Sequence, residues 1–268
     1  MTHIQTDTIT INGYDCDAYG RLSVPALMNF MQEAANRNAL AYGIGIADLA
    51  TRQVGWMLMR FRLRMHHYPT YGQTIRVVTY PTAVEKYFIY RDFQVLADDG
   101  TLLAEATSTW LVFATDTRTM VPMPAFIRSL VVPQGITPQP HLPAKPDFLN
   151  QAFVRATEKL VEVGWLSIDM NHHVNNVAYV QWLLESIDHQ WLHTREIAEL
   201  DLVYRAECHL NDRLRAQSAV VSEGEQLHRI EHSETGKEVL LARSRWRGFG
   251  LSPLVGILGG GSAPARLG

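Results

Sequence analysis

Residues 14–35, YDCDAYGRLSVPALMNFMQEAA, and residues 166–187, LSIDMNHHVNNVAYVQWLLESI, carry the same pattern at an offset of 152 positions. Asp17 coincides with Asp169 at this offset, and the apolar positions agree through the second part of both segments. The sequence therefore predicts two related halves, each beginning with a strand, a loop and one long helix.

The start of each predicted helix is marked by a capping residue. Ser23 and Asn175 stand just before an apolar helical run, and Pro25 occupies a first-turn position where proline is tolerated. Apolar side chains occur around most of the circumference of both helices, so other elements are expected to enclose them. The segments that follow have the composition and alternation of strands. These predicted strands are residues 56–65, 74–80, 87–97 and 101–115 in the first half and residues 200–208, 214–221, 226–232 and 238–249 in the second.

A helix wrapped by an antiparallel sheet, formed twice, is an α+β arrangement that resembles a tandem double hotdog. The boundary between the halves is expected where five prolines fall within 14 positions, because this density excludes a helix or a central strand. We expect an N-terminal hotdog at residues 1–132, a proline-rich linker at 133–147, a C-terminal hotdog at 148–250 and a flexible tail at 251–268.

The composition argues against several classes of protein. A net charge of -3 and a pI near 6.4 provide no general attraction to nucleic acid or to anionic membranes. The sequence has no run of about 18 apolar residues and no signal-peptide pattern at its start, so a cytoplasmic protein without membrane insertion is expected. Cys16 and Cys208 are too few for a disulfide framework and are expected to be free thiols.

Two separated motifs contain the residues most typical of a reactive site. In the first, Asp169, Asn171 and His173 alternate before Val-Asn-Asn and a helix that ends in W-x-x-E-S. The second, VYRAEC, ends with the adjacent residues Glu207 and Cys208. Together they resemble the motifs of the acyl-ACP thioesterase family, in which D-x-N-x-H precedes V-N-N, and Y-R-x-E-C lies on a strand.

The resemblance implies a double hotdog with one active site in the second half. The implied activity is release of free fatty acid from acyl-acyl carrier protein in fatty acid biosynthesis, without a cofactor or a metal. The implied partner is acyl carrier protein with its phosphopantetheine-linked acyl chain. An acyl-CoA thioesterase on the same fold and a non-catalytic acyl-binding module are the alternatives. The acyl chain length and the choice between monomer and homodimer stay open.

The chemistry of these residue types agrees with thioester hydrolysis. The reaction needs a donor to the carbonyl oxygen, a base for water and a proton for the leaving thiolate. Asn171, or the helix that Asn175 caps, could stabilise the oxyanion. His173 or Glu207 could transfer the proton, and Asp169 would orient a neighbour.

Two mechanisms follow from the second motif. Glu207 and Cys208 are adjacent on a predicted strand, so their side chains are expected to point to opposite faces and only one should face the site. Cys208 could act as a nucleophile activated by His173, or water could attack directly after activation by Glu207 or His173. Water is favoured, because a carboxylate beside a histidine suffices for hydrolysis.

The first half departs from the motif at two decisive positions. At the offset of 152, Tyr19 replaces Asn171 and Arg21 replaces His173. One catalytic site is therefore expected, and by resemblance to the family the first half would shape the acyl pocket.

Basic and histidine-rich segments give two further expectations. Two rows of alternating arginines each lie on one face of a predicted strand and are candidate docking surfaces for an acidic carrier protein. The adjacent histidines at 66–67 and 172–173 have no further ligands at a usual spacing, so no metal site is expected. The arginine rows are Arg60, Arg62 and Arg64, and Arg243, Arg245 and Arg247.

Overall fold

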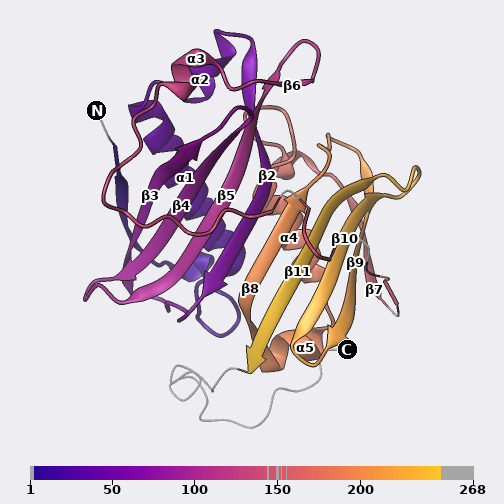
Figure 1. Cartoon of the computed structure of the whole chain (residues 1–268). Helices are drawn as coiled ribbons and strands as arrows, with labels where there is room; N and C mark the ends of the chain where they lie inside the picture. The colour runs from indigo at the N-terminus through magenta and orange to yellow at the C-terminus, as the bar shows by residue number, and fades with distance from the viewer. Residues whose placement is uncertain (1–2, 144, 149–150, 152, 155, 249–268) are drawn as a thin grey trace.

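One large antiparallel sheet continues through both halves of the chain in the computed structural model (Figure 1). The structure describes residues 3–143, 145–148, 151, 153–154 and 156–248, so the predicted tail at 251–268 lies outside the described residues. The strand order is β1-β3-β4-β5-β2-β8-β11-β10-β9-β7, and the short β6 pairs with β5. With the helices this gives the expected α+β class. The strands are β1 (Gln5–Thr10), β2 (Val54–Met65), β3 (Thr74–Val84), β4 (Phe88–Ala97), β5 (Leu102–Ala114), β6 (Met120–Val121), β7 (Thr157–Glu162), β8 (Arg195–Tyr204), β9 (Arg213–Ser222), β10 (Glu225–His232) and β11 (Glu238–Gly248).

Two helices pack side by side against this sheet. α1 contacts β1 and β3, α4 contacts β7, β9 and β10, and the two helices contact each other. Both predicted caps are confirmed: Ser23 Oγ accepts the N–H of Ala26 at 3.3 Å, and Asn175 Oδ1 accepts the N–H of Val177 at 2.9 Å. Among the described residues, no helix is long and apolar enough to cross a membrane. The helices are α1 (Val24–Ala41), α2 (Ile46–Ala50), α3 (Ala125–Arg128), α4 (Asn176–Glu185) and α5 (His189–Thr194).

The internal repeat predicted from the sequence is present in the structure. β1 and β7 begin and end 152 positions apart, and so do the 3-10 turns Gly13–Asp15 and Trp165–Ser167. The correspondence ends inside the helices, because α1 has 18 residues and α4 only 10. The expected long second helix is therefore wrong: Asp188 caps a new helix, α5, by accepting the N–H of Gln190 at 2.7 Å.

The two halves are joined by the pairing of β2 with β8. Arg60 of β2 and Asp201 of β8 form a two-pronged ion pair across this junction, with Nε–Oδ1 at 2.9 Å and Nη2–Oδ2 at 2.7 Å. Both residues are buried. Because an unpaired buried charge is costly, this pair ties the register of one half to that of the other.

The predicted linker lies against the outer face of the sheet. Between α3 and β7, the described residues form no helix or strand. The backbone N–H of Gln139 donates to Asp92 Oδ2 at 2.7 Å, and the ring of His141 stacks on Tyr90 with centroids 3.8 Å apart. Arg91, the neighbour of Asp92 on β4, instead donates to Asn38 of α1 at 2.9 Å. The linker and α1 therefore cover opposite faces of β4.

Replacing Asp201 with alanine should lower the free energy of unfolding by about 3–5 kcal/mol, because it leaves the buried Arg60 guanidinium without its carboxylate. Glu199→Ala is the matched control on the same face of β8. The arginines that pair with Glu199, Arg64 and Arg245, are 41% and 51% exposed, so its loss should cost about 1 kcal/mol or less. Urea unfolding followed by circular dichroism measures both, and equal losses would contradict the role of the buried pair.

Candidate active site

A cavity of about 790 Å³ is lined by residues of both halves. Its polar part contains Asp169, Asn171, His173 and Glu207, so the two separated motifs meet here. Much of its remaining wall is apolar and comes from α1, α2, β2, β4 and β5 of the first half, and Val174, Tyr179 and Tyr204 of the second half complete it. The apolar residues of this wall include Ala35, Ala39, Ile44, Leu49, Met57, Leu58, Ile89, Trp110 and Phe113.

Asp169 shapes the loop that precedes α4. Its Oδ1 accepts the backbone N–H of Asn171 at 2.8 Å and that of His173 at 3.5 Å, and its Oδ2 accepts from the Asn171 side-chain amide at 3.3 Å. His172 adopts φ 62°, a left-handed conformation that closes the turn. Asp169 thereby places Asn171 and His173 on the cavity wall.

The equivalent loop of the first half uses the same support. Asp17 Oδ1 accepts the backbone N–H groups of Tyr19 at 2.9 Å and of Arg21 at 3.0 Å. Arg21, in the position of His173, forms ion pairs with Asp17 at 2.8 Å and with Glu196 of β8 at 3.0 Å. The first-half loop therefore makes a structural contact with the second half. The equivalent loop of the second half instead presents His173 to the cavity.

His173 lies beside two charged groups at the polar end of the cavity. Its Nε2 is 3.8 Å from Glu207 Oε2 and 3.5 Å from a guanidinium nitrogen of Arg118, and Arg118 also forms an ion pair with Glu207. Burial lowers the pKa of His173, and the positive charge of Arg118 lowers it further. The imidazole is therefore held neutral near pH 7, the form that can accept a proton.

Arg118 is a site residue that the sequence analysis missed. It belongs to the turn between β5 and β6 in the first half and has φ 55°. No motif surrounds it, and 55 positions separate it from His173. Only the folded sheet brings this turn to the second-half loop.

The second motif is not wholly on a strand, which corrects the prediction. The strand expected at 200–208 ends at Tyr204, and residues 205–212 form a loop before β9. Arg205 and Ala206 still donate to the Val239 carbonyl of β11, but Cys208 bonds to α4 and the loop before it: its N–H donates to the Tyr179 hydroxyl at 3.1 Å, and its carbonyl accepts the N–H of Val174 at 3.1 Å. These bonds hold the loop against the start of α4 and leave Glu207 on the cavity wall.

The structure does not bring Cys208 together with the other predicted site residues. Its side chain is buried and is not among the described residues that line the cavity. Its Sγ lies 3.7 Å from Nε2 of His232, not beside His173. Burial raises the pKa of the thiol to about 11, so little thiolate is present at neutral pH.

The amino end of α4 also reaches the cavity. Asn175 and Asn176 line it, and the Tyr204 hydroxyl donates to the Asn176 carbonyl at 3.1 Å, which anchors the first turn. The Asn175 side-chain oxygen is occupied as a cap, as described above. The partial positive charge of this helix end therefore faces the polar part of the cavity.

Most of the arginines in the two rows form ion pairs with carboxylates at the sheet junction. Arg60, Arg64, Arg245 and Arg247 pair with acidic residues of β8, and Arg243 pairs with Asp147 at 3.0 Å. These pairs explain the rows structurally and do not support the docking prediction.

The overall fold is shared with thioesterases of known structure. An acyl-ACP thioesterase from Bacteroides thetaiotaomicron superposes with a TM-score of 0.75 at 23% identity, covering 91% of this chain and 98% of that one. The 12:0-ACP thioesterase from Umbellularia californica superposes with a TM-score of 0.78 at 26% identity, covering 92% and 98%. The chain thus has the fold of acyl-ACP thioesterases of known structure.

Family models identify the chain further. The Acyl-ACP thioesterase N-terminal domain matches residues 3–130, and the Acyl-ACP thioesterase C-terminal domain matches residues 151–248. The chain therefore belongs to the acyl-ACP thioesterase family. A chloroplastic acyl-[acyl-carrier-protein] hydrolase, FATB2, of Cuphea viscosissima is 27% identical over 252 residues. That match covers 89% of this chain, which spans only 61% of the relative's length.

Native thiol labelling should distinguish the two cysteines. Cys16 is partly exposed and Cys208 is buried, and the structure records both as free thiols. An alkylating reagent should therefore modify Cys16 alone until denaturant is added, when a second thiol becomes reactive. The variant Cys16→Ser should show almost no native labelling. Rapid native labelling in that variant would show instead that Cys208 is accessible, as a nucleophile must be.

Proposed function

We propose that this chain is an acyl-ACP thioesterase that hydrolyses the thioester at the site around His173 and releases a free fatty acid. The observation that carries the proposal is the cavity itself, which places a histidine, a carboxylate and an amide at the end of a largely apolar chamber. An apolar chamber suits an acyl chain, and the polar cluster suits its carbonyl group. Family membership supports the same activity.

The proposed architecture is a tandem double hotdog with a division of labour. Residues 1–132 form the half that binds the acyl chain, residues 148–250 form the half that contains the catalytic residues, and residues 133–147 join them. The cavity wall contributed by α1, α2 and β2 supports this division. Since one chain supplies both halves, the site needs no second copy. The plant relative is named as chloroplastic. A cytoplasmic location for this chain therefore stays a prediction.

In the proposed mechanism, water attacks the thioester carbonyl directly. His173 is neutral and takes the proton from water as the oxygen bonds to the carbonyl carbon. Asn171 and the amino end of α4 stabilise the oxyanion that forms. The tetrahedral intermediate then collapses, the carbon–sulfur bond breaks, and the proton passes to the leaving thiolate. Glu207, held by Arg118, positions the water and the imidazole.

Cys208 is not a nucleophile in this mechanism. An acyl-enzyme would require its thiolate to reach the carbonyl, and its buried side chain faces His232, outside the cavity. A water mechanism needs only groups that already line the cavity. Asp169 acts through the loop that it supports and not by touching the substrate.

Turnover of acyl-ACPs and matching acyl-CoAs tests the function. The wild type should release fatty acid preferentially from acyl-ACP, and His173→Ala and Glu207→Ala should each lower kcat/KM by about 10²–10⁴-fold. His172→Asn is the control, because asparagine tolerates the left-handed conformation of this neighbouring histidine. Preference for acyl-CoA would support the alternative carrier, whereas tight acyl binding without turnover would support a binding module.

The pH profile tests the role of His173. Its pKa is lowered from 6.5, so the active neutral form persists to a lower pH and activity should fall only below about 6.5. Arg118→Gln removes a positive charge, which should raise the pKa of His173 and move this acid limb to higher pH. Arg128→Gln, on α3, should leave the limb in place. An acid limb that does not move in Arg118→Gln would argue against His173 as the base.

A further inference from the structure

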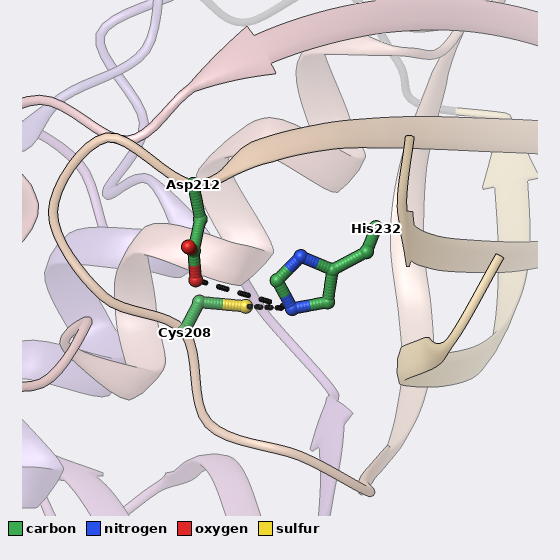
Figure 2. A group of neighbouring side chains, drawn as sticks. All are labelled: Cys208, Asp212 and His232. Carbon is green, nitrogen blue, oxygen red and sulfur yellow. Dashed lines mark hydrogen bonds and ion pairs between the residues drawn. The ribbon is translucent and has the colours of Figure 1, made fainter. Parts of the chain in front are cut away.

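Three side chains with metal-binding atoms, two from the loop at 205–212 and one from the end of β10, converge in Figure 2. Cys208 and Asp212 belong to the loop between β8 and β9, and His232 is the last residue of β10. His232 Nε2 lies 3.7 Å from Cys208 Sγ and 3.9 Å from Asp212 Oδ2, and all three donor atoms lie within 4.8 Å of one another. None of the three lines the catalytic cavity.

These separations are close to those of a zinc site. Around tetrahedral Zn²⁺, a thiolate sulfur and an imidazole nitrogen are about 3.5 Å apart, and the nitrogen and a carboxylate oxygen about 3.4 Å. The two distances from His232 Nε2 exceed these values by half an ångström or less. The Cys208 sulfur and the Asp212 carboxylate oxygen lie within 4.8 Å of each other, against about 3.6 Å around zinc, so these two ligands draw together when the ion binds. Thiolate and imidazole ligands together also select zinc over magnesium or calcium, which prefer oxygen. We propose that Cys208, Asp212 and His232 form a Zn²⁺ site.

The surroundings of the cluster suit this role. A second cavity, of about 280 Å³, borders two of the three proposed ligands, Asp212 and His232, and is large enough for an ion and a water molecule. Its other lining residues are Asn211, Arg213, Glu234 and Thr235. Asp212 Oδ2 also accepts the backbone N–H of His209 at 2.8 Å, which orients the carboxylate. Asn211 adopts φ 70°, a left-handed conformation that turns the loop at 205–212. With this turn, Cys208 and Asp212 both face His232.

Zinc at this site ties the loop at 205–212 to the end of β10. Glu207 precedes the ligand Cys208 and faces the catalytic cavity, so the metal holds the catalytic loop from behind. This consequence for catalysis rests on the proposed function, whereas metal binding does not. The proposed site differs from the expectation that no metal binds. The sequence did not indicate it, because 24 positions separate Cys208 from His232 and no short motif links them.

Metal binding to the full chain, stripped with a chelator, tests the proposal without any substrate. Zn²⁺ titrated against a competing colorimetric chelator should bind at one equivalent, with a Kd tighter than about 1 μM. Co²⁺ in place of zinc should give a thiolate-to-cobalt charge-transfer band and the intense visible absorption of a four-coordinate ion. Failure of the wild type to bind stoichiometric zinc, or absence of the thiolate band, would overturn the site whether or not the protein hydrolyses thioesters.

Variants assign the ligands. Cys208→Ser, Asp212→Asn and His232→Gln should each weaken zinc binding at least about tenfold, and Cys208→Ser should abolish the thiolate band. Cys16→Ser and His172→Asn are matched controls, a thiol and a histidine outside the cluster, and should bind zinc as the wild type does. Circular dichroism of each metal-free variant checks its folding. Undiminished binding in a folded Cys208→Ser or His232→Gln variant would contradict the assignment.

Discussion

The pairing of β2 with β8 is the constraint on which the rest of the structure depends. It joins two five-stranded runs into one sheet, and the buried ion pair of Arg60 with Asp201 fixes its register. With this register set, α1 lies beside α4 and the turn that holds Arg118 reaches the loop that holds His173. The cavity lined by both halves therefore follows from a contact that contains none of the proposed catalytic residues.

Duplication of one loop explains why the two halves differ in role. Asp17 and Asp169 bond the backbone of their loops in the same way, so the shared aspartate supports the turn in both halves. The side chain that each turn presents then decides the role of its loop. Arg21 pairs with Glu196 and helps to join the halves, whereas His173 faces a cavity whose apolar wall comes largely from the other half. A loop that joins the halves in one case can thus present the proposed base in the other.

Local patterns were predictable from the sequence, whereas contacts between residues far apart in the sequence were not. The caps at Ser23 and Asn175 are confirmed, because each depends on a bond within a few residues. The repeat at an offset of 152 is confirmed by strands and turns with matching bounds. The end of β8 at Tyr204 was missed, because the loop that follows is held by the bond from Cys208 to the distant Tyr179. Strand pairing decides which carboxylates the arginine rows meet and what Arg118 and His232 contact. Residues close to them in the sequence do not indicate this pairing.

The most direct measurement is a crystal structure with a non-hydrolysable acyl-pantetheine amide bound. We expect the acyl chain to lie against α1, α2 and β2 of the first half, with the amide carbonyl within hydrogen-bonding distance of Asn171 or the amino end of α4, and with His173 close enough to activate water at the carbonyl carbon. An acyl chain bound elsewhere, or a carbonyl beside Arg21 or Cys208, would contradict both the site and the division of labour between the halves.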